Sequence, residues 1–225
     1  MACATPPGFG KAVLVISRLH ISFPKMKKVV LSLLLIGGLS GVAHAQSDVS
    51  LGLKAGGSLT DFVGADAAFY EKQFGFHAGI FANIGITQLV AFQPELLYSQ
   101  KGAAQPLTGS NEKLIDRLHY VDVPLAFHVN ADGLFFEAGP QVGILAAAKS
   151  KVGSASTDIK GRYNDVDLGY LAGLGYQRKS GLGIGLRYNG GITKVQQKFT
   201  VGNTTIQARS RNEAFQLYLT YSFGG

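Results

Sequence analysis

Strict alternation of apolar residues with small or polar ones is the feature that most constrains this chain. Period-two alternation is the signature of β-strands whose two faces meet different surroundings. Each stretch runs for about 11 to 13 residues, against five or six for a common globular strand. The sequence therefore predicts an all-β chain with eight long strands, at approximately 48–58, 73–85, 89–101, 117–129, 134–146, 166–178, 182–193 and 213–223.

The connections between these strands alternate in length. Three are short and contain turn residues, at 86–88, 130–133 and 179–181. The other four, at 59–72, 102–116, 147–165 and 194–212, are long and polar. Short turns at one end and long loops at the other are typical of outer-membrane barrels, whose strands need about 9 to 11 residues to cross a bilayer. We expect an eight-stranded antiparallel up-and-down transmembrane β-barrel with both termini periplasmic.

Alternation alone does not say which face points inward, and a soluble lipocalin-like barrel is the opposite assignment. The interior of an eight-stranded barrel is just wide enough for side chains to fill. Glycines beside a few large polar residues fit that space, whereas the aromatic face would overfill it. We therefore expect the apolar face to meet lipid, with two aromatic girdles. They are Phe74, Phe76, Tyr98, Tyr170 and Phe215 near the long loops, and Phe92, Phe127, Phe136, Tyr176, Tyr221 and Phe223 near the short turns.

The first 45 residues look like a processing signal. Met26-Lys27-Lys28 is a basic start, 29–39 is an apolar run, and Ala43-His44-Ala45 is a cleavage site. We expect a signal peptide at 26–45, a misassigned upstream extension at 1–25, and the barrel domain at 46–225. Five of the 21 basic residues and none of the 14 acids precede residue 46, which leaves a formal charge of +2. That balance gives no reason to expect nucleic acid as a partner.

Three prolines lie inside predicted strands: Pro94, Pro124 and Pro140. Each removes a backbone donor from the ladder, and a closed barrel has no edge strand to accommodate the loss. We expect a local bulge at each of the three positions.

A resemblance is carried by seven segments: GFHAGIFANI (75–84), FQPELLYSQKG (92–102), YVDVPLAFHV (120–129), FFEAGPQVG (135–143), LGYLAGLGYQ (168–177), LRYNGGIT (186–193) and LYLTYSF (217–223). These segments resemble a known family, the porin-family or PorT-like outer-membrane β-barrel proteins. The resemblance implies a barrel similar to OmpX or the transmembrane part of OmpA, in the bacterial outer membrane. The closing aromatics resemble the signal read by the barrel-insertion machinery, although Gly224 and Gly225 follow Phe223. Because most such proteins are defined by the barrel alone, the resemblance is specific for fold and weak for function.

Ionisable residues fall on the inward face, mostly near mid-height. A cation on the lipid face at that depth would cost about 2 to 4 kcal/mol. We expect Arg187 to bind Glu137 and Glu95, because a guanidinium stays charged and binds carboxylates bidentately. Such a network either plugs the lumen or gates a narrow pore for ions or small solutes, and we favour the plug. The predicted lumen set is Lys54, His77, Glu95, Asp122, Glu137, Gln141, Arg187 and Tyr218.

The basic residues of the long loops and His119 are the remaining candidates for function. Basic residues at the outer end either meet lipopolysaccharide phosphates or are simply solvated. His119 is the one candidate for a lipid-modifying enzyme, and we predict no enzymatic activity, no cofactor and no metal site. The expected role is structural or surface interaction with outer-membrane lipid. The predicted basic loop residues are Lys149, Lys151, Lys160, Arg162, Lys194, Lys198, Arg209 and Arg211.

Overall fold

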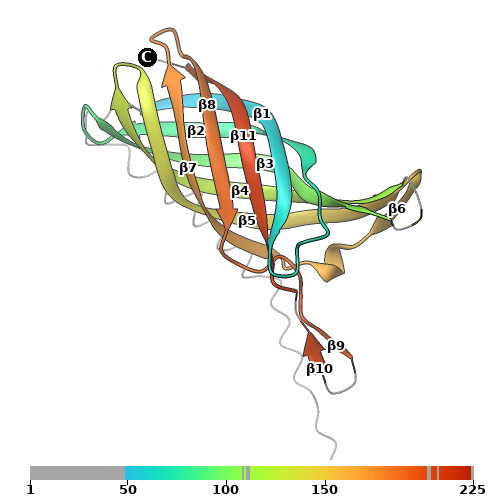
Figure 1. Cartoon of the computed structure of the whole chain (residues 1–225). Helices are drawn as coiled ribbons and strands as arrows, with labels where there is room; N and C mark the ends of the chain where they lie inside the picture. The colour runs from blue at the N-terminus through green and yellow to red at the C-terminus, as the bar shows by residue number, and fades with distance from the viewer. Residues whose placement is uncertain (1–48, 108, 110–111, 202–203, 207, 224–225) are drawn as a thin grey trace, which may run out of the picture. The chain divides into compact units, whose positions relative to one another are not determined.

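The computed structural model describes residues 49–223, apart from 108, 110–111, 202–203 and 207 (Figure 1). The predicted leader lies outside the described residues. The described residues form strands and one short 3-10 turn, η1 (Lys160–Arg162). The strands are β1 (Val49–Gly64), β2 (Gln73–Gly85), β3 (Val90–Pro106), β4 (Lys113–Ala131), β5 (Leu134–Val152), β6 (Ala155–Asp158), β7 (Val166–Gln177), β8 (Leu182–Gly191), β9 (Phe199–Val201), β10 (Thr204–Ile206) and β11 (Ser210–Phe223).

The main sheet closes on itself. Its nine strands follow the order β4-β3-β2-β1-β11-β8-β7-β5-β6, and β4 also pairs with β5. Because β6 pairs only with β5, the other eight strands form the ring, and every pairing in it is antiparallel. β9 and β10 form a separate hairpin in the connection between β8 and β11. The predicted eight-stranded antiparallel barrel is confirmed. Among the described residues, no helix is long and apolar enough to cross a membrane.

Tight turns join β2 to β3, β4 to β5 and β7 to β8. In the β4–β5 turn, Asp132 and Gly133 have φ of 48° and 89°. Two successive residues with positive φ give a turn whose twist matches that of paired antiparallel strands. We call this end of the barrel the short-turn end and the opposite one the long-loop end.

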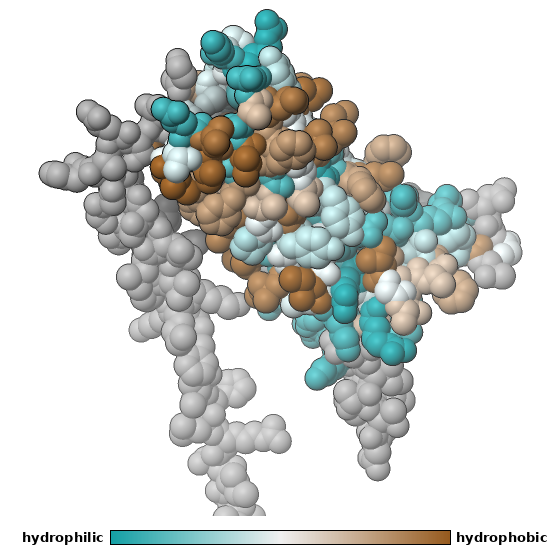
Figure 2. Space-filling model, turned by 60° about the vertical axis from the view of Figure 1, so that its left-hand side comes forward, coloured by the Kyte–Doolittle hydropathy of each residue, from teal (hydrophilic) through white to brown (hydrophobic). Residues whose placement is uncertain are grey.

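Apolar side chains cover the outside of the barrel, as predicted. Along β11, Leu217 and Leu219 are 55% and 62% exposed, whereas Tyr218 between them is 1% exposed. Brown, apolar side chains gather over the barrel wall in Figure 2, and teal ones gather toward its ends. This outward apolar face excludes the soluble-barrel alternative, because its exposed leucines and aromatics would face water there.

Strands at the long-loop end run further than predicted. β1 continues to Gly64, β3 to Pro106 and β5 to Val152, so much of the predicted loops 59–72, 102–116 and 147–165 is strand. Of the residues assigned to basic loops, Lys149 and Lys151 lie in β5 and Arg211 lies in β11. The reason is environmental: outside the membrane a strand can be polar on both faces, so its alternation disappears while its backbone pairing continues.

The expected proline bulges are absent from the described strands. Pairing of β3 with β4 keeps one register on both sides of Pro94, and the register of β4 with β5 is unchanged on both sides of Pro124. Pro140 pairs with Tyr170 in an uninterrupted β5–β7 register. The prolines therefore remove ladder donors without inserting a residue. The register shift lies elsewhere, between His119 and Tyr120 of β4.

Candidate functional site

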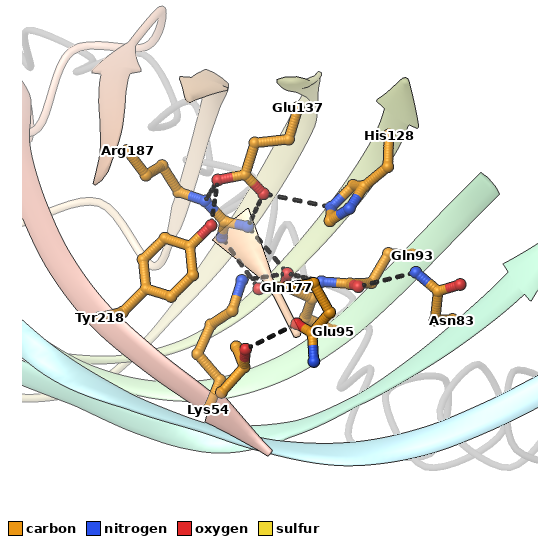
Figure 3. A network of polar contacts seen from close by, with 10 residues as sticks. Lys54, Asn83, Gln93, Glu95, His128, Glu137, Gln177, Arg187 and Tyr218 are labelled. Atoms are coloured by element: carbon orange, nitrogen blue, oxygen red, sulfur yellow. Dashed lines mark hydrogen bonds and ion pairs between the residues drawn. The ribbon is translucent and has the colours of Figure 1, made fainter. Parts of the chain in front are cut away.

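Four charged side chains meet inside the barrel, one from every second strand of the ring (Figure 3). Lys54 comes from β1, Glu95 from β3, Glu137 from β5 and Arg187 from β8. Alternate strands approach the axis from four directions, which is why residues far apart in sequence reach each other. Their side chains are 0% or 1% exposed, and their formal charges sum to zero.

Arg187 is the centre of this network. Toward Glu137, its Nε lies 2.8 Å from Oε1 and its Nη2 lies 2.5 Å from Oε2. Toward Glu95, its Nη1 lies 2.9 Å from Oε2 and its Nη2 lies 2.8 Å from Oε1. Both carboxylates are thus bound bidentately, the geometry in which charge-assisted hydrogen bonds are strongest and most directional.

Further polar groups complete the coordination of the two carboxylates. Lys54 Nζ lies 2.6 Å from Glu95 Oε1 and 4.1 Å from the centroid of the Tyr218 ring. Glu95 also accepts a hydrogen bond from Gln93 (2.8 Å), and Glu137 accepts one from the Tyr218 hydroxyl (2.8 Å). His128 Nε2 lies 3.3 Å from Glu137 Oε2. Burying these ions is tolerable because each carboxylate oxygen has a donor.

A glycine leaves room for the central pair. Gly173 of β7 pairs with Glu137 on one side and with Arg187 on the other. A Cβ atom at Gly173 would lie 2.6 Å from Glu137 Oε1 and 3.1 Å from the Arg187 Cα. The inward glycine is therefore what allows the two long side chains to meet across β7.

The remaining predicted lumen residues are also buried inside the barrel. His77 lies on β2 with its Nδ1 3.0 Å from the Ser58 hydroxyl. Asp122 lies on β4 and binds Lys101 at 3.0 Å. Gln141 of β5 is 7% exposed and is not part of the Arg187 network. Five of the eight predicted residues thus belong to the central network, His77 and Asp122 contact Ser58 and Lys101 instead, and Gln141 is buried outside these contacts.

A cavity of about 600 Å³ occupies the lumen at the short-turn end. Its inner limit includes Tyr218, Gln93 and His128, which contact the central network. Its lining also includes Arg178 and Lys179 of the β7–β8 turn. Among the described residues its lining contains no carboxylate, so these residues make an anion the easier charged species to accommodate there.

An apolar cluster fills the other end of the lumen. Tyr163 lies in it, and its hydroxyl donates a 2.7 Å hydrogen bond to Asp116 Oδ2. Burial raises the pKa of the Tyr163 hydroxyl, and the neighbouring Asp116 charge raises that pKa further. The cluster combines inward residues of β1, β3, β4 and β5 with residues from the loops: Phe62, Ala67, Ala103, Leu118, Tyr120, Leu145, Ala148, Ile159, Tyr163 and Val195. The long connections therefore fold back over the barrel mouth.

The predicted basic residues come from four parts of the chain, and backbone hydrogen bonds join two of them, the segment around η1 and the connection between β8 and β11. Lys149 and Lys151 lie on β5, with Lys160 and Arg162 in η1. Lys194, Lys198 and Arg209 lie in the connection between β8 and β11. Arg209 is engaged by Asp66, which lies 3.6 Å from its Nε and accepts a 2.8 Å hydrogen bond from its backbone N–H.

Sequence reasoning missed several inward residues. Lys101 shares the parity of Glu95 on β3, so counting along that strand would have found it. His128 shares the inward parity of Asp122 on β4 but was not included in the predicted lumen set. The contact between Tyr163 and Asp116 joins residues 47 positions apart, and nothing in the sequence of a loop predicts it.

His119, the candidate for lipid chemistry, lies on the outward face of β4. Its Nδ1 is 2.5 Å from the Tyr98 hydroxyl, a contact that positions the ring but brings neither a serine hydroxyl nor a carboxylate to it. Within the described part of the chain, no three His, Cys, Asp or Glu side chains are grouped so as to hold a metal ion.

A solved bacterial surface protein shares this fold. Neisserial surface protein A has a TM-score of 0.51 and 17% identity, with 78% of this chain and 99% of that one covered. Ail of Yersinia pestis has a TM-score of 0.41 and 14% identity, with 80% and 100% covered. No curated protein matches. The model of the outer membrane protein beta-barrel domain matches residues 44–197, so this chain belongs to that family of bacterial outer-membrane barrels.

Proposed function

We propose that this protein is a structural or surface-interaction barrel whose lumen does not conduct solutes. The supporting observation is the Arg187 network, which joins β1, β3, β5 and β8 across the axis. An eight-stranded barrel has space for side chains but little more, and here that space holds neutralised, hydrogen-bonded charges. The apolar cluster around Tyr163 closes the lumen a second time, at the long-loop end.

The surface-interaction role is supported by the uneven strand lengths. β3, β4 and β5 have 17, 19 and 19 residues, whereas β7 and β8 have 12 and 10. The longer strands extend one side of the barrel wall at the long-loop end, and all four residues of β6 are exposed there. Such a protruding sheet offers backbone groups and side chains to partners outside the membrane. During biogenesis, the closing aromatics of β11 would meet the insertion machinery.

Single-channel recording in planar bilayers tests the closed lumen. We expect wild-type protein to give no conductance steps, and Arg187→Ala to be silent as well, since the cluster around Tyr163 still closes the mouth. A double variant, Arg187→Ala with Tyr163→Ala, removes both closures and is expected to conduct. Regular steps from the wild type would contradict the proposal.

A narrow pore for ions or small solutes is the second candidate. The cavity of about 600 Å³ favours it, because it leads from the short-turn end to Tyr218 and the central network. In that case Arg187 acts as a gate, and Arg187→Ala alone is expected to raise conductance well above the wild-type level. A lipid-modifying enzyme has weaker support, since His119 is bonded to Tyr98.

A further inference from the structure

Two cationic side chains stand directly opposite each other on the outward face of the barrel. Arg117 of β4 pairs with Lys149 of β5, and their inward neighbours Leu118 and Ala148 are both 0% exposed. Like charges placed directly opposite destabilise a sheet. Among the described residues neither cation belongs to an ion pair. Asp158 of β6 lies opposite Lys149 and offsets part of this repulsion, whereas the residues opposite Arg117 are Gly102 and Lys149, neither of which is a carboxylate.

Arg117 also carries a donor without an acceptor. Its Nε is shielded from solvent and, within the described residues, has no hydrogen-bond partner. Buried donors are nearly always paired in folded proteins, so an unpaired donor at this position indicates a missing acceptor. An oxyanion bound by the guanidinium fork would satisfy the Nε and would screen the charge of Lys149 at the same time.

A β-bulge aligns these groups and adds a third cation. His119 pairs with Ala147 while Tyr120 pairs with Leu145, so Ala146 is the extra residue of β5. Without this shift, the parity of β5 would put Lys149 opposite an inward residue. Bulges of this kind re-aim side chains. The freed carbonyl of Ala146 accepts a 3.1 Å hydrogen bond from Lys160 Nζ.

One carboxylate lies nearby and is already engaged. Asp158 of β6 is opposite Lys149, and its Oδ1 accepts a 2.9 Å hydrogen bond from the backbone N–H of Lys160. We call Arg117, His119, Lys149 and Lys160 the Arg117 patch. Three permanent cations against one carboxylate leave the patch positive.

The patch borders the apolar surface. Two positions from His119 along β4, Val121 is 37% exposed, and Ile144 opposite it on β5 is 48% exposed. Tyr98, whose hydroxyl contacts His119, is one of the predicted girdle aromatics and is 40% exposed. Aromatic girdles mark the depth of the lipid headgroups. An anion at the Arg117 patch is therefore at the level of a headgroup whose acyl chains can cover Val121 and Ile144.

We propose that the Arg117 patch binds a phosphate group of lipopolysaccharide in the outer leaflet. This inference rests on the outward apolar face and on the long-loop end facing the cell exterior. It does not depend on whether the lumen conducts. The bilayer recordings therefore test only the closed lumen, and the binding experiment tests only the Arg117 patch. It also selects one of the predicted basic groups, since Arg209 already has Asp66 as its partner.

A lipid titration monitored by native mass spectrometry tests the site. The full-length protein in detergent is titrated with diphosphorylated lipid A, and bound and free barrels are counted. Arg117→Gln with Lys149→Gln is expected to weaken binding roughly tenfold, since it removes two charge-assisted contacts. Lys149→Gln alone, which changes an exposed side chain, is expected to give an intermediate loss and protects the test against a folding defect. Arg209→Gln with Arg211→Gln removes the same charge from two exposed residues elsewhere at the long-loop end and is expected to leave binding within about twofold of the wild type.

Two further ligands in the same titration identify the chemical group that the patch binds. Dephosphorylated lipid A is expected to bind the wild type only as well as phosphorylated lipid A binds the double variant. Inorganic phosphate at the lipid concentration is expected not to displace the lipid. Without lipid, the double variant is expected to unfold at a higher temperature than the wild type, because the repulsion is gone. Equal lipid affinity in wild type and double variant, indifference to phosphorylation, or displacement by inorganic phosphate would each overturn the proposal.

Discussion

The guanidinium of Arg187 binds both carboxylate oxygens of Glu137, through Nε at 2.8 Å and through Nη2 at 2.5 Å. Gly173 between them supplies the space, and Glu95 occupies the other side of the guanidinium. This ion pair fixes β5 and β8 relative to each other across β7. The stability of the barrel therefore depends on the single charge of Arg187.

Arg187→Ala is expected to destabilise the barrel by about 3 to 5 kcal/mol, because two buried carboxylates lose their main counter-ion. The urea midpoint of heat-modifiability on a gel measures this. Arg178→Ala, at an exposed turn, is the control and is expected to change stability by less than about 0.5 kcal/mol. Equal midpoints for Arg187→Ala and wild type would show that the network contributes little.

Gly173→Ala and Gly57→Ala compare a glycine that faces the lumen from β7 with one that faces outward from β1. At Gly173 the new methyl would lie 2.6 Å from Glu137 Oε1, while at Gly57 it would meet nothing within 4 Å. We expect Gly173→Ala to cost about 1 to 3 kcal/mol through overpacking. Gly57→Ala is expected to be neutral or slightly stabilising, because glycine weakens a strand. The same urea titration compares them, and equal effects would contradict the packing argument.

Tyr163→Phe is expected to loosen the closure at the long-loop end. It removes the donor to the buried Asp116 Oδ2, and Asp116 Oδ1 already lacks a hydrogen-bond partner among the described residues. Leaving that carboxylate unpaired costs about 1 to 3 kcal/mol. Hydrogen exchange should speed up at Ile159 and Val195, which belong to the same cluster, and remain unchanged at the β4–β5 turn. Unchanged protection at Ile159 would mean that the hydrogen bond does not hold the cluster together.

The same tyrosine predicts a pH dependence at alkaline pH. The pKa of Tyr163 is raised in the folded protein, by burial first and then by the charge of Asp116, with Tyr70 and Tyr120 as further neighbours. A raised pKa means that the folded protein holds its proton longer than the unfolded chain does. The stabilisation is therefore complete below the unfolded pKa of about 10 and decreases as the pH rises above it. Hydrogen exchange at Ile159, corrected for its intrinsic pH dependence, measures the loss, and Tyr163→Phe should abolish this component.

Leu217→Arg and Leu182→Arg compare two depths of the lipid-facing wall. Both leucines are about half exposed, at 55% and 52%, but Leu217 lies well inside β11 whereas Leu182 begins β8 next to a short turn. An arginine at mid-depth costs about 2 to 4 kcal/mol in a bilayer, against about 0 to 1 near an interface. Folding into lipid vesicles at increasing urea gives the two values. Similar costs at both positions would contradict the assigned membrane depth.

The alternation pattern determined more of this protein than any single motif did. It was enough to predict the eight strands, the outward apolar face and the inward parity of residues such as Lys54 and Tyr218. The reason is that a barrel wall is one residue thick: a side chain points either to lipid or to the lumen, and period two decides which. The predictions failed where that rule no longer applies. Beyond the membrane Lys149 and Lys151 are in strand rather than loop, and at the prolines the ladder loses donors without changing register.

Only the tertiary structure decided which inward residues meet. Parity placed Glu95, Glu137 and Arg187 in the lumen, but their contact depends on the height at which each strand pairs with its neighbour. That height is set by the summed registers around the closed ring, which no single strand encodes. The β-bulge beside His119 and the return of Tyr163 to Asp116 were decided in the same way. One-dimensional periodicity fixes the direction of a side chain, whereas its partners depend on how the whole sheet closes.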